Sequence, residues 1–348
     1  MRVNNTEIGG KRPFVIAEIG ANHQGSLEIC KKLFLSAKNA GVDAVKLQKR
    51  DNKTLFTSKM YNEPYNSENS FGSSYGEHRE FLEFNKNQYL ELKKYATELG
   101  LIFFSTPFDI KSAFFLNEEI DIPIFKIASA DITNKELIEC VLSFDKPIIV
   151  STGGANKKDV ERVYNLLKKK KKKKNFALMH CTSSYPTDTK DINLNVINEM
   201  KKNFSNCIIG YSSHHNGIST ELIAYILGAR IFEKHFTLNR SWKGTDQSFS
   251  LEFSGMSKLV RDLNRIEEAL GSKEKKFLKS ESKAIYKLSK SLYTSRDLPK
   301  GHVLTSDDVM VRCPGGGFNP FDIEKILGKK IKRKLSHEHL IKSSDFEK

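Results

Sequence analysis

The sequence lacks several features that mark membrane-bound or secreted proteins. No apolar run approaches the ~18 residues that a membrane-spanning helix requires, and the first residues, MRVNNTEIGGKRP, contain no hydrophobic signal core. Only five cysteines occur, odd in number, widely spaced and without a CxxC pair, so neither a disulfide framework nor a cysteine zinc site is indicated. We therefore expect a soluble, cytoplasmic protein.

Acidic residues are scarce relative to basic ones, with 42 Asp and Glu against 57 Lys and Arg, which gives a net charge of +15. The densest basic segment is the lysine run 168–174, which follows an amphipathic helical pattern. Cations suit a helix C-terminus, and no aromatic interleaving, zinc finger or RNP-like motif lies beside the run. We interpret it as a solvated helix end, and we expect neither a nucleic acid nor a membrane as partner.

Short apolar runs alternate with helical patterns eight times over about 270 residues. This alternation predicts a closed (β/α)8 TIM barrel over residues 1–271. An open doubly wound sheet is the structural alternative, but the glycine-rich GxGxxG turn typical of it is absent. We predict a charged linker at 272–287 and a small β-rich domain at 288–348. The polar stretch 50–79 has little periodicity and is predicted to be a long functional loop.

One β-α-β unit, between Cys207 and Glu252, carries the strongest chemical signal. His214 follows one predicted strand and His235 follows the next. The carboxyl ends of neighbouring parallel strands lie side by side, so both imidazoles can reach one divalent metal ion. The alternative is that one or both histidines only cap a strand end by hydrogen bonding.

Further polar residues follow the other predicted strands, at the end where active sites of such barrels lie. Cations and hydroxyl groups suited to a phosphate are Lys46, Lys126, Ser129, Ser151, Ser183 and Ser212. Groups suited to proton transfer and to a polyhydroxylated ligand are Glu18, Gln48, Asp131, Tyr185 and Asp246. A buried lysine pair is costly without an opposite charge, so we expect an anionic ligand beside Lys46 and Lys126. Each hydroxyl taken alone is better explained as a strand cap or a turn residue, and the interpretation rests on their shared position.

The chain closely resembles the sialic acid synthases in the order and spacing of its motifs. These motifs are FVIAEIGANHQGS, VKLQ, FSTPFD, FKIASAD, STGG, HCTSSYP, IGYSSHHNG, ARIFEKHFTL and KGTDQSFSLE. The C-terminal 60 or so residues resemble the antifreeze-like (SAF) domain of that family. The resemblance implies a barrel followed by a SAF domain, a domain-swapped homodimer, and condensation of phosphoenolpyruvate with an N-acetylmannosamine-type sugar.

The resemblance also implies roles for individual residues. His214 and His235 would hold the metal, Mn or Mg, and Gln48 and Asp246 would face the sugar together with Glu18. Phosphoenolpyruvate would be surrounded by Lys46, Lys126, Ser129, Ser151, Ser183 and Ser212, with Tyr185 nearby. Proton transfer would fall to Asp131 or Glu18.

Two positions depart from the bacterial pattern. Asp131 stands where bacterial neuraminate synthases have a catalytic Glu, although the animal 9-phosphate synthases have Asp. Cys313 stands where the bacterial SAF domain has an arginine that reaches the partner's sugar, and Arg312 lies one place earlier. We therefore include Arg312 as a candidate sugar contact, through a shift of register.

Other functions remain open at this point. Another metal-dependent aldolase or a phosphosugar enzyme on the same barrel is the principal alternative. A binding protein that uses its basic surface for nucleic acid, or its SAF domain for ice or polysaccharide, is a third. Within the resembling family, the acceptor can be N-acetylmannosamine, its 6-phosphate, or a di-N-acetylated deoxysugar that leads to legionaminic or pseudaminic acid.

Overall fold

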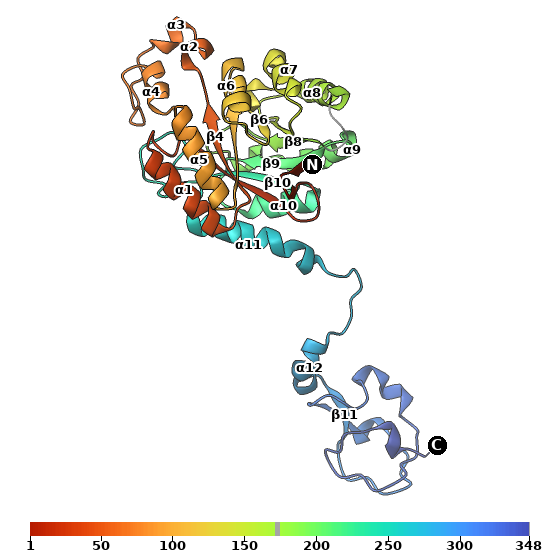
Figure 1. Cartoon of the computed structure of the whole chain (residues 1–348). Helices are drawn as coiled ribbons and strands as arrows, with labels where there is room; N and C mark the ends of the chain where they lie inside the picture. The colour runs from red at the N-terminus through yellow and green to blue at the C-terminus, as the bar shows by residue number, and fades with distance from the viewer. Residues whose placement is uncertain (171–174, 348) are drawn as a thin grey trace. The chain divides into compact units, whose positions relative to one another are not determined.

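Eight parallel strands close into a barrel in the computed structural model, which describes residues 1–170 and 175–347 (Figure 1). The predicted (β/α)8 architecture is confirmed. The strands are β3 (Phe14–Gly20), β4 (Ala44–Lys49), β5 (Ile102–Pro107), β6 (Phe125–Ile127), β7 (Ile148–Ser151), β8 (Phe176–Cys181), β9 (Ile208–Ser213) and β10 (Ile231–His235). Strand β10 pairs with both β9 and β3, which closes the barrel. A two-stranded hairpin of β1 (Arg2–Val3) and β2 (Thr6–Glu7) precedes it.

Helices cover the outside of the barrel (Figure 1). They are α1 (Leu27–Ala40), α5 (Lys86–Glu98), α6 (Ile110–Phe114), α7 (Lys135–Ser143), α8 (Lys157–Lys170), α9 (Asn195–Asn203), α10 (Ser219–Leu227) and α11 (Phe253–Leu270). Because side chains fill one face of each strand and helices cover the other, every residue of β3 is buried. No helix in the described ranges combines the length and apolarity needed to span a membrane.

Local signals set the limits of α1. The Ser26 side chain accepts a hydrogen bond from the backbone N–H of Ile29, which caps the N-terminus. Gly41 ends the helix with a φ of 89°, a left-handed conformation that glycine adopts without strain. Both ends of α1 therefore depend on contacts within about one turn of the chain.

The stretch 50–85, predicted in large part as a loop, contains three short helices. These are α2 (Asn52–Leu55), α3 (Ser58–Tyr61) and α4 (Tyr75–Phe81). Each begins at a side-chain cap, and Ser74 and Glu77 form a reciprocal capping box at α4. None of these helices exceeds two turns, so they produce no detectable hydrophobic period. We call residues 50–85 the lid segment.

The chain divides into two compact units, Met1–Gly271 and Ser272–Lys348. The first residues of the second unit, predicted as a linker, contain a 3-10 turn (Lys279–Glu281) and the start of helix α12 (Ser282–Leu288). Strands β11 (Ser291–Thr294) and β12 (Val309–Arg312) then pair antiparallel. The rest of the unit consists of isolated β-bridges and 3-10 turns around a small core of its own.

The second unit contains an internal repeat that the sequence reading missed. Two aspartates are fully buried there, and both accept hydrogen bonds from an arginine and contact a histidine. Asp308 contacts Arg296 and His302, and Asp345 contacts Arg333 and His339 with the same spacing along the chain. Reciprocal backbone hydrogen bonds between Leu298 and Leu335, of 2.8 and 2.9 Å, join the two halves.

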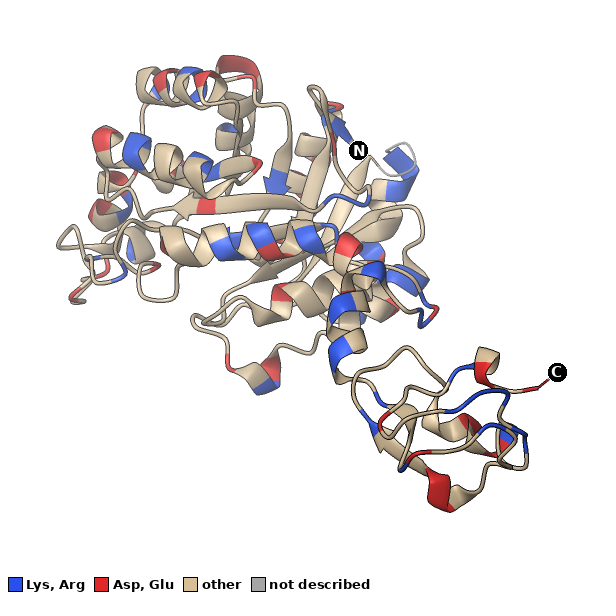
Figure 2. Cartoon of the chain, turned by 90° about the horizontal axis from the view of Figure 1, so that it is seen from below, with Lys and Arg blue, Asp and Glu red and all other residues tan. Residues whose placement is uncertain are grey.

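Charged residues of both signs are interspersed along the helices (Figure 2). Lys168, Lys169 and Lys170 form the exposed last turn of α8, as expected for a solvated helix end. The remaining lysines of the run, residues 171–174, lie outside the described residues.

Candidate active site

A cavity of about 650 Å³ lies at the carboxyl ends of the barrel strands. Its wall contains predicted site residues from seven of the eight strands or the turns after them, and one more from the loop after β10. These residues are Glu18, Lys46, Gln48, Lys126, Ser129, Ser151, Ser183, Tyr185, Ser212, His214, His235 and Asp246. Another cavity of about 650 Å³, lined by α9, the start of α8 and the chain after β7 and β8, contains none of the predicted site residues.

Two lysines and two glutamates form a buried charge cluster on the cavity wall. Lys46 Nζ lies 2.7 Å from Glu18 Oε2, and Lys126 Nζ lies 3.3 Å from Glu233 Oε1. Glu233 Oε1 also lies 3.8 Å from Lys46 Nζ. Two carboxylates of the chain thus lie beside the lysine pair for which we expect an anionic ligand.

Glu233 was not among the predicted site residues, although it lies two positions before His235 on β10. Burial alone would raise the pKa of Glu233, but Lys126 and Lys46 outweigh burial and lower it to about 2. Burial lowers the pKa of Lys126, and Glu233 offsets only part of that effect. The Glu233 carboxylate favours the charged form of both lysines, and this form attracts a phosphate or a carboxylate.

Hydroxyl groups surround one side of this cluster. Ser212 Oγ donates to Glu233 Oε1 at 3.3 Å, and Ser129 Oγ accepts from the Gly153 backbone N–H at 3.0 Å. Ser151 Oγ is buried without a hydrogen-bond partner in the protein. A Cβ on Gly153 would collide with Ser183 Oγ, so only glycine allows this close approach. Together these groups form a cradle of donors suited to a phosphate.

The two predicted metal ligands lie side by side. The rings of His214 and His235 are 5.4 Å apart between centroids. His214 Nδ1 lies 3.1 Å from the carbonyl oxygen of Thr182, which only accepts, so Nδ1 carries the proton and Nε2 keeps its lone pair. His235 Nδ1 is buried without a hydrogen-bond partner, 3.7 Å from Asp246 Oδ2.

Imidazole nitrogens are suitable ligands for a divalent ion. Burial, reinforced by the nearby His235, lowers the pKa of His214 to about 3, so the ring stays neutral and able to bind metal. No group of three His, Cys, Asp or Glu side chains that could hold a metal occurs within residues 1–170 and 175–347. The arrangement is therefore two imidazoles beside a carboxylate. His215 points elsewhere, to Thr220 and Lys234.

The predicted sugar side of the cavity is a row of hydrogen-bonded polar groups. Gln48 Nε2 donates to Glu18 Oε1 at 2.9 Å, and Gln48 Oε1 accepts from Arg50 Nη2 at 2.7 Å. Arg50 and Arg79, both from the lid segment, also line the cavity. The sequence reading missed both arginines because they lie in a stretch without periodicity.

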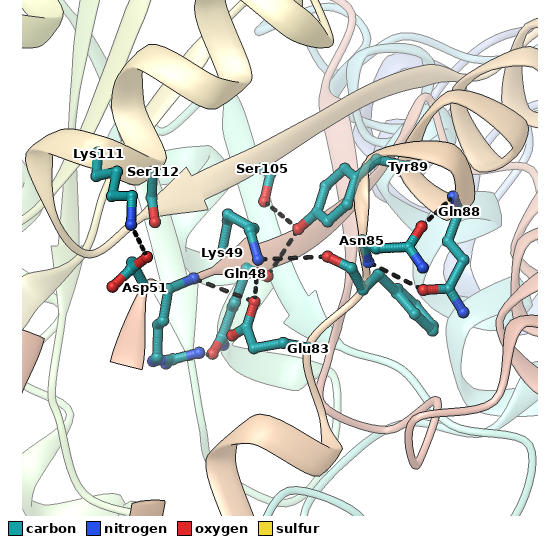
Figure 3. Close-up of polar contacts among 12 residues, drawn as sticks. Gln48, Lys49, Asp51, Glu83, Asn85, Gln88, Tyr89, Ser105, Lys111 and Ser112 are labelled. Atoms are coloured by element: carbon teal, nitrogen blue, oxygen red, sulfur yellow. Dashed lines mark hydrogen bonds and ion pairs between the residues drawn. The ribbon is translucent and has the colours of Figure 1, made fainter. Parts of the chain in front are cut away.

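The base of the lid segment is fixed to the barrel (Figure 3). Lys49 Nζ lies 2.7 Å from Glu83 Oε2, and the backbone N–H of Arg50 donates to the same oxygen at 3.3 Å. The hydroxyl of Tyr89 donates to the backbone carbonyl of Gln48 at 2.8 Å. Asp51 forms a further ion pair of 2.5 Å with Lys111.

Asp131 is a predicted site residue that is not among those lining the cavity. Asp131 lies in a 3-10 turn at Ser129–Asp131, and its neighbours Ala130 and Ile132 both line the cavity. Asp131 Oδ1 accepts from Asn134, Oδ2 has no partner, and burial raises the pKa of Asp131. Arg312 is the exposed last residue of β12, in the second unit.

Comparisons with known proteins agree with this geometry. A model of the NeuB family matches residues 33–275, and a SAF domain model matches residues 289–347. The chain is 39% identical to the human N-acetylneuraminate-9-phosphate synthase, over 93% of this chain and 90% of that protein. It is 35% identical to the N,N'-diacetyllegionaminic acid synthase of Campylobacter jejuni, over 95% of this chain and 99% of that protein. It is also similar to a crystal structure of an N-acetylneuraminic acid synthetase from Leptospira borgpetersenii in complex with citrate, with a TM-score of 0.70 and 34% identity over 82% of this chain and 94% of that one.

Proposed function

The chain belongs to the NeuB family, and from this membership we propose that it condenses phosphoenolpyruvate with an N-acylmannosamine-type sugar and releases phosphate. One observation supports the reaction most directly. The Lys46 and Lys126 pair, with its cradle of hydroxyl groups, shares a single cavity with the polar row that contains Gln48 and Asp246. The cavity therefore offers adjoining places for an anionic and a polyhydroxylated substrate.

In the proposed reaction, Lys46, Lys126 and the surrounding serines bind phosphoenolpyruvate. Its C3 attacks the aldehyde carbon of the open-chain sugar, which forms the new carbon–carbon bond and leaves a cationic C2, while the aldehyde oxygen becomes an alkoxide that takes up a proton. Water adds to C2, and the bond between C2 and the phosphate oxygen then breaks. The lysines stabilise the departing phosphate because they hold positive charge in a site shielded from water.

Glu18 is the favoured group for proton transfer. Its carboxylate contacts both Lys46 on the phosphoenolpyruvate side and Gln48 on the sugar side, so it lies where the two substrates meet. It can take a proton from the water that adds to C2. Asp131 is less well placed because its carboxylate is off the cavity wall.

His214 and His235 are the proposed ligands of a divalent ion, Mn or Mg, with Asp246 beside them. A bound ion would act as a Lewis acid on the aldehyde oxygen of the sugar. The neutral ring of His214, oriented by the Thr182 carbonyl, supports this assignment.

A homodimer is the proposed assembly. Apolar side chains are unusually exposed at the start of the second unit, where Phe277 is 65% and Leu288 69% exposed. Exposed apolar residues close together in the chain are typical of a surface that another protein covers. A second copy of the chain is the partner that the family resemblance implies.

Incubation of the purified protein with phosphoenolpyruvate, Mn²⁺ and a panel of N-acyl amino sugars tests the reaction. We expect equimolar phosphate and a product whose mass equals the two substrates plus water minus phosphoric acid. Phosphate release with simple aldehydes but with no N-acyl sugar would favour the alternative, another metal-dependent aldolase. No condensation with any acceptor would contradict the proposal.

A further inference from the structure

Lys234 is a buried cation that the proposed reaction does not use. It precedes His235 on β10, and its side chain is only 1% exposed. Successive side chains of a strand point to opposite faces, and Glu233 and His235 both line the cavity whereas Lys234 does not. Lys234 therefore lies on the outer face of the barrel, in the layer between the strands and the helices that cover them.

This layer is apolar elsewhere on the same strand. Phe232, which shares its face of β10 with Lys234, is fully buried. A charged side chain in such a place loses its hydration, so its presence requires compensating contacts. Replacement of a buried ion pair by well-packed apolar side chains is often neutral or stabilising, so a contribution to stability does not by itself account for Lys234.

The ammonium group of Lys234 has three N–H donors, and three oxygen acceptors surround it. Its Nζ lies 3.0 Å from Ser213 Oγ, 2.7 Å from the backbone carbonyl oxygen of His215 and 3.3 Å from Glu221 Oε1. The Ser213 hydroxyl in turn donates to Glu221, which is buried at the start of α10. Thr220 donates to the other carboxylate oxygen of Glu221 at 3.3 Å. The lysine is thus fully compensated in the apolar layer.

The contacts of Lys234 lie on both sides of His214. Ser213 precedes His214 and His215 follows it, so one ammonium group binds the chain before and after the first imidazole. Lys234 itself precedes His235, the second proposed ligand. A side chain of β10 therefore joins the two segments that carry the imidazoles.

The backbone ladder alone does not hold His214. Strand β9 ends at Ser213, and the last register pair between β9 and β10 is Ser213 with Lys234. His214 comes directly after this point. Metal ligands must be held to within about 0.5 Å of their working positions. The contact of Lys234 with the His215 carbonyl restrains the chain where the ladder no longer does.

We propose that Lys234 is a positioning residue for the divalent-ion site, which holds the chain on both sides of His214 against the strand that carries His235 and so fixes the separation of the two imidazoles. Glu221 balances the charge of the ammonium group. This inference rests on the proposed function, because it requires that both histidines bind a metal ion. Removal of a group that orients metal ligands commonly weakens metal binding about 10–100-fold.

Calorimetric titration of the full-length protein with Mn²⁺, in the absence of substrates, tests this role. Lys234→Met combined with Glu221→Leu removes both charges and leaves apolar side chains in the apolar layer, so the variant should stay folded. We expect its affinity for Mn²⁺ to fall about 10–100-fold. The rise in melting temperature caused by inorganic phosphate should match that of the wild type, because neither residue lines the cavity. A general loosening of the barrel would reduce both responses.

Three single variants complete the test. Ser213→Ala removes one acceptor of Lys234 and should lower the affinity for Mn²⁺ about two- to tenfold. Tyr225→Phe is the matched control, since it removes a hydroxyl of the same helix that contacts Glu267 at 2.7 Å, and it should keep the wild-type affinity. His215→Ala should also keep it, because the backbone carbonyl that Lys234 contacts remains.

Wild-type affinity for Mn²⁺ in the folded double variant, or an equal loss of affinity in Tyr225→Phe, would refute the positioning role. If the double variant does not fold, an unchanged affinity in Ser213→Ala refutes it instead. Mn²⁺ binding that depends on Lys234, without condensation of any N-acyl sugar, would refute the proposed reaction and leave the positioning role standing. Condensation by a wild-type protein that binds no Mn²⁺ would refute the positioning role and leave the carbon–carbon bond formation standing.

Discussion

Lys126 and Glu233 are 107 residues apart in the chain, and their side chains meet at 3.3 Å inside the barrel. Glu233 also lies 3.8 Å from Lys46, so one carboxylate balances two buried cations. This relationship makes the cavity stable without a ligand and at the same time limits how strongly it attracts phosphate.

Glu233→Gln should destabilise the protein and strengthen its response to phosphate. Removal of one partner of a buried ion pair costs about 3 kcal/mol, so the melting temperature should fall. Inorganic phosphate should then raise the melting temperature of the variant more than that of the wild type, because it replaces the lost charge. Glu221→Gln is the control. Glu221 forms an ion pair of 3.3 Å with buried Lys234, and neither residue lines the cavity. An equal response to phosphate in the two variants would contradict the role given to Glu233.

Glu83→Gln should loosen the base of the lid segment. The variant loses the charge that holds Lys49 and a backbone contact to Arg50, so the KM for the acceptor should rise at least about fivefold while that for phosphoenolpyruvate changes little. Limited proteolysis should also cut residues 50–85 faster. Glu119→Gln, which breaks an exposed pair with Lys86, is the matched control and should leave both measurements unchanged. Parallel increases in both KM values would argue against this function of Glu83.

His214→Ala and His235→Ala should each bind Mn²⁺ at least about 10–100-fold more weakly, as the loss of one ligand and its oriented environment predicts. Chelator treatment should abolish condensation, and added Mn²⁺ or Mg²⁺ should restore it. Calorimetric titration with Mn²⁺ measures the affinity directly. His215→Ala should keep metal binding because its ring contacts Thr220 and Lys234 instead. Full activity of the metal-free enzyme would contradict the assignment of His214 and His235 as ligands of a required metal ion.

Arg312→Ala tests whether this residue has taken over the sugar contact of the SAF domain. We expect the KM for the sugar to rise far more than the KM for phosphoenolpyruvate, because the loss concerns only the acceptor. Lys300→Ala, an exposed basic residue of the same unit, should change neither. Identical kinetics of the Arg312 variant and the wild type would show that the N-acyl group is recognised elsewhere.

Asp308 should make the second unit sensitive to acid. Burial alone would raise the pKa of Asp308, but hydrogen bonds from His302, Thr305 and Arg296 outweigh burial and hold it well below its usual range. A carboxyl whose pKa is lower in the folded state stabilises the fold above its unfolded pKa of about 3.9, and this stabilisation is lost as the pH falls through the folded value. Asp308→Asn should therefore cost about 2–3 kcal/mol at pH 7 and much less at pH 2.

Thermal unfolding of the second unit, followed between pH 2 and pH 7, measures this dependence. Asp345→Asn should behave like Asp308→Asn because Asp345 occupies the equivalent place in the repeat. Asp307→Asn changes the exposed neighbour and serves as the control. If Asp308→Asn lowers the stability of the second unit by the same amount at every pH, the charge of the Asp308 carboxylate contributes nothing to that stability.

The sequence by itself determined the barrel and the strand-end positions of Lys46, Lys126, His214 and His235. Strand periodicity and parallel order decide which residues emerge at the carboxyl rim, and both are properties of short stretches of chain. The ends of α1 were equally predictable, since Ser26 and Gly41 act on the backbone within one turn.

Only the tertiary structure decided which charges meet and which side chains face the cavity. Glu233 balances two lysines because strands distant in sequence converge inside the closed barrel. Arg50 and Arg79 reach the cavity because long-range contacts such as Lys49 with Glu83 fold the lid segment over it, and no local pattern encodes those contacts. Asp131 follows β6 within a 3-10 turn, and the period of a strand does not predict on which side of such a turn a side chain lies.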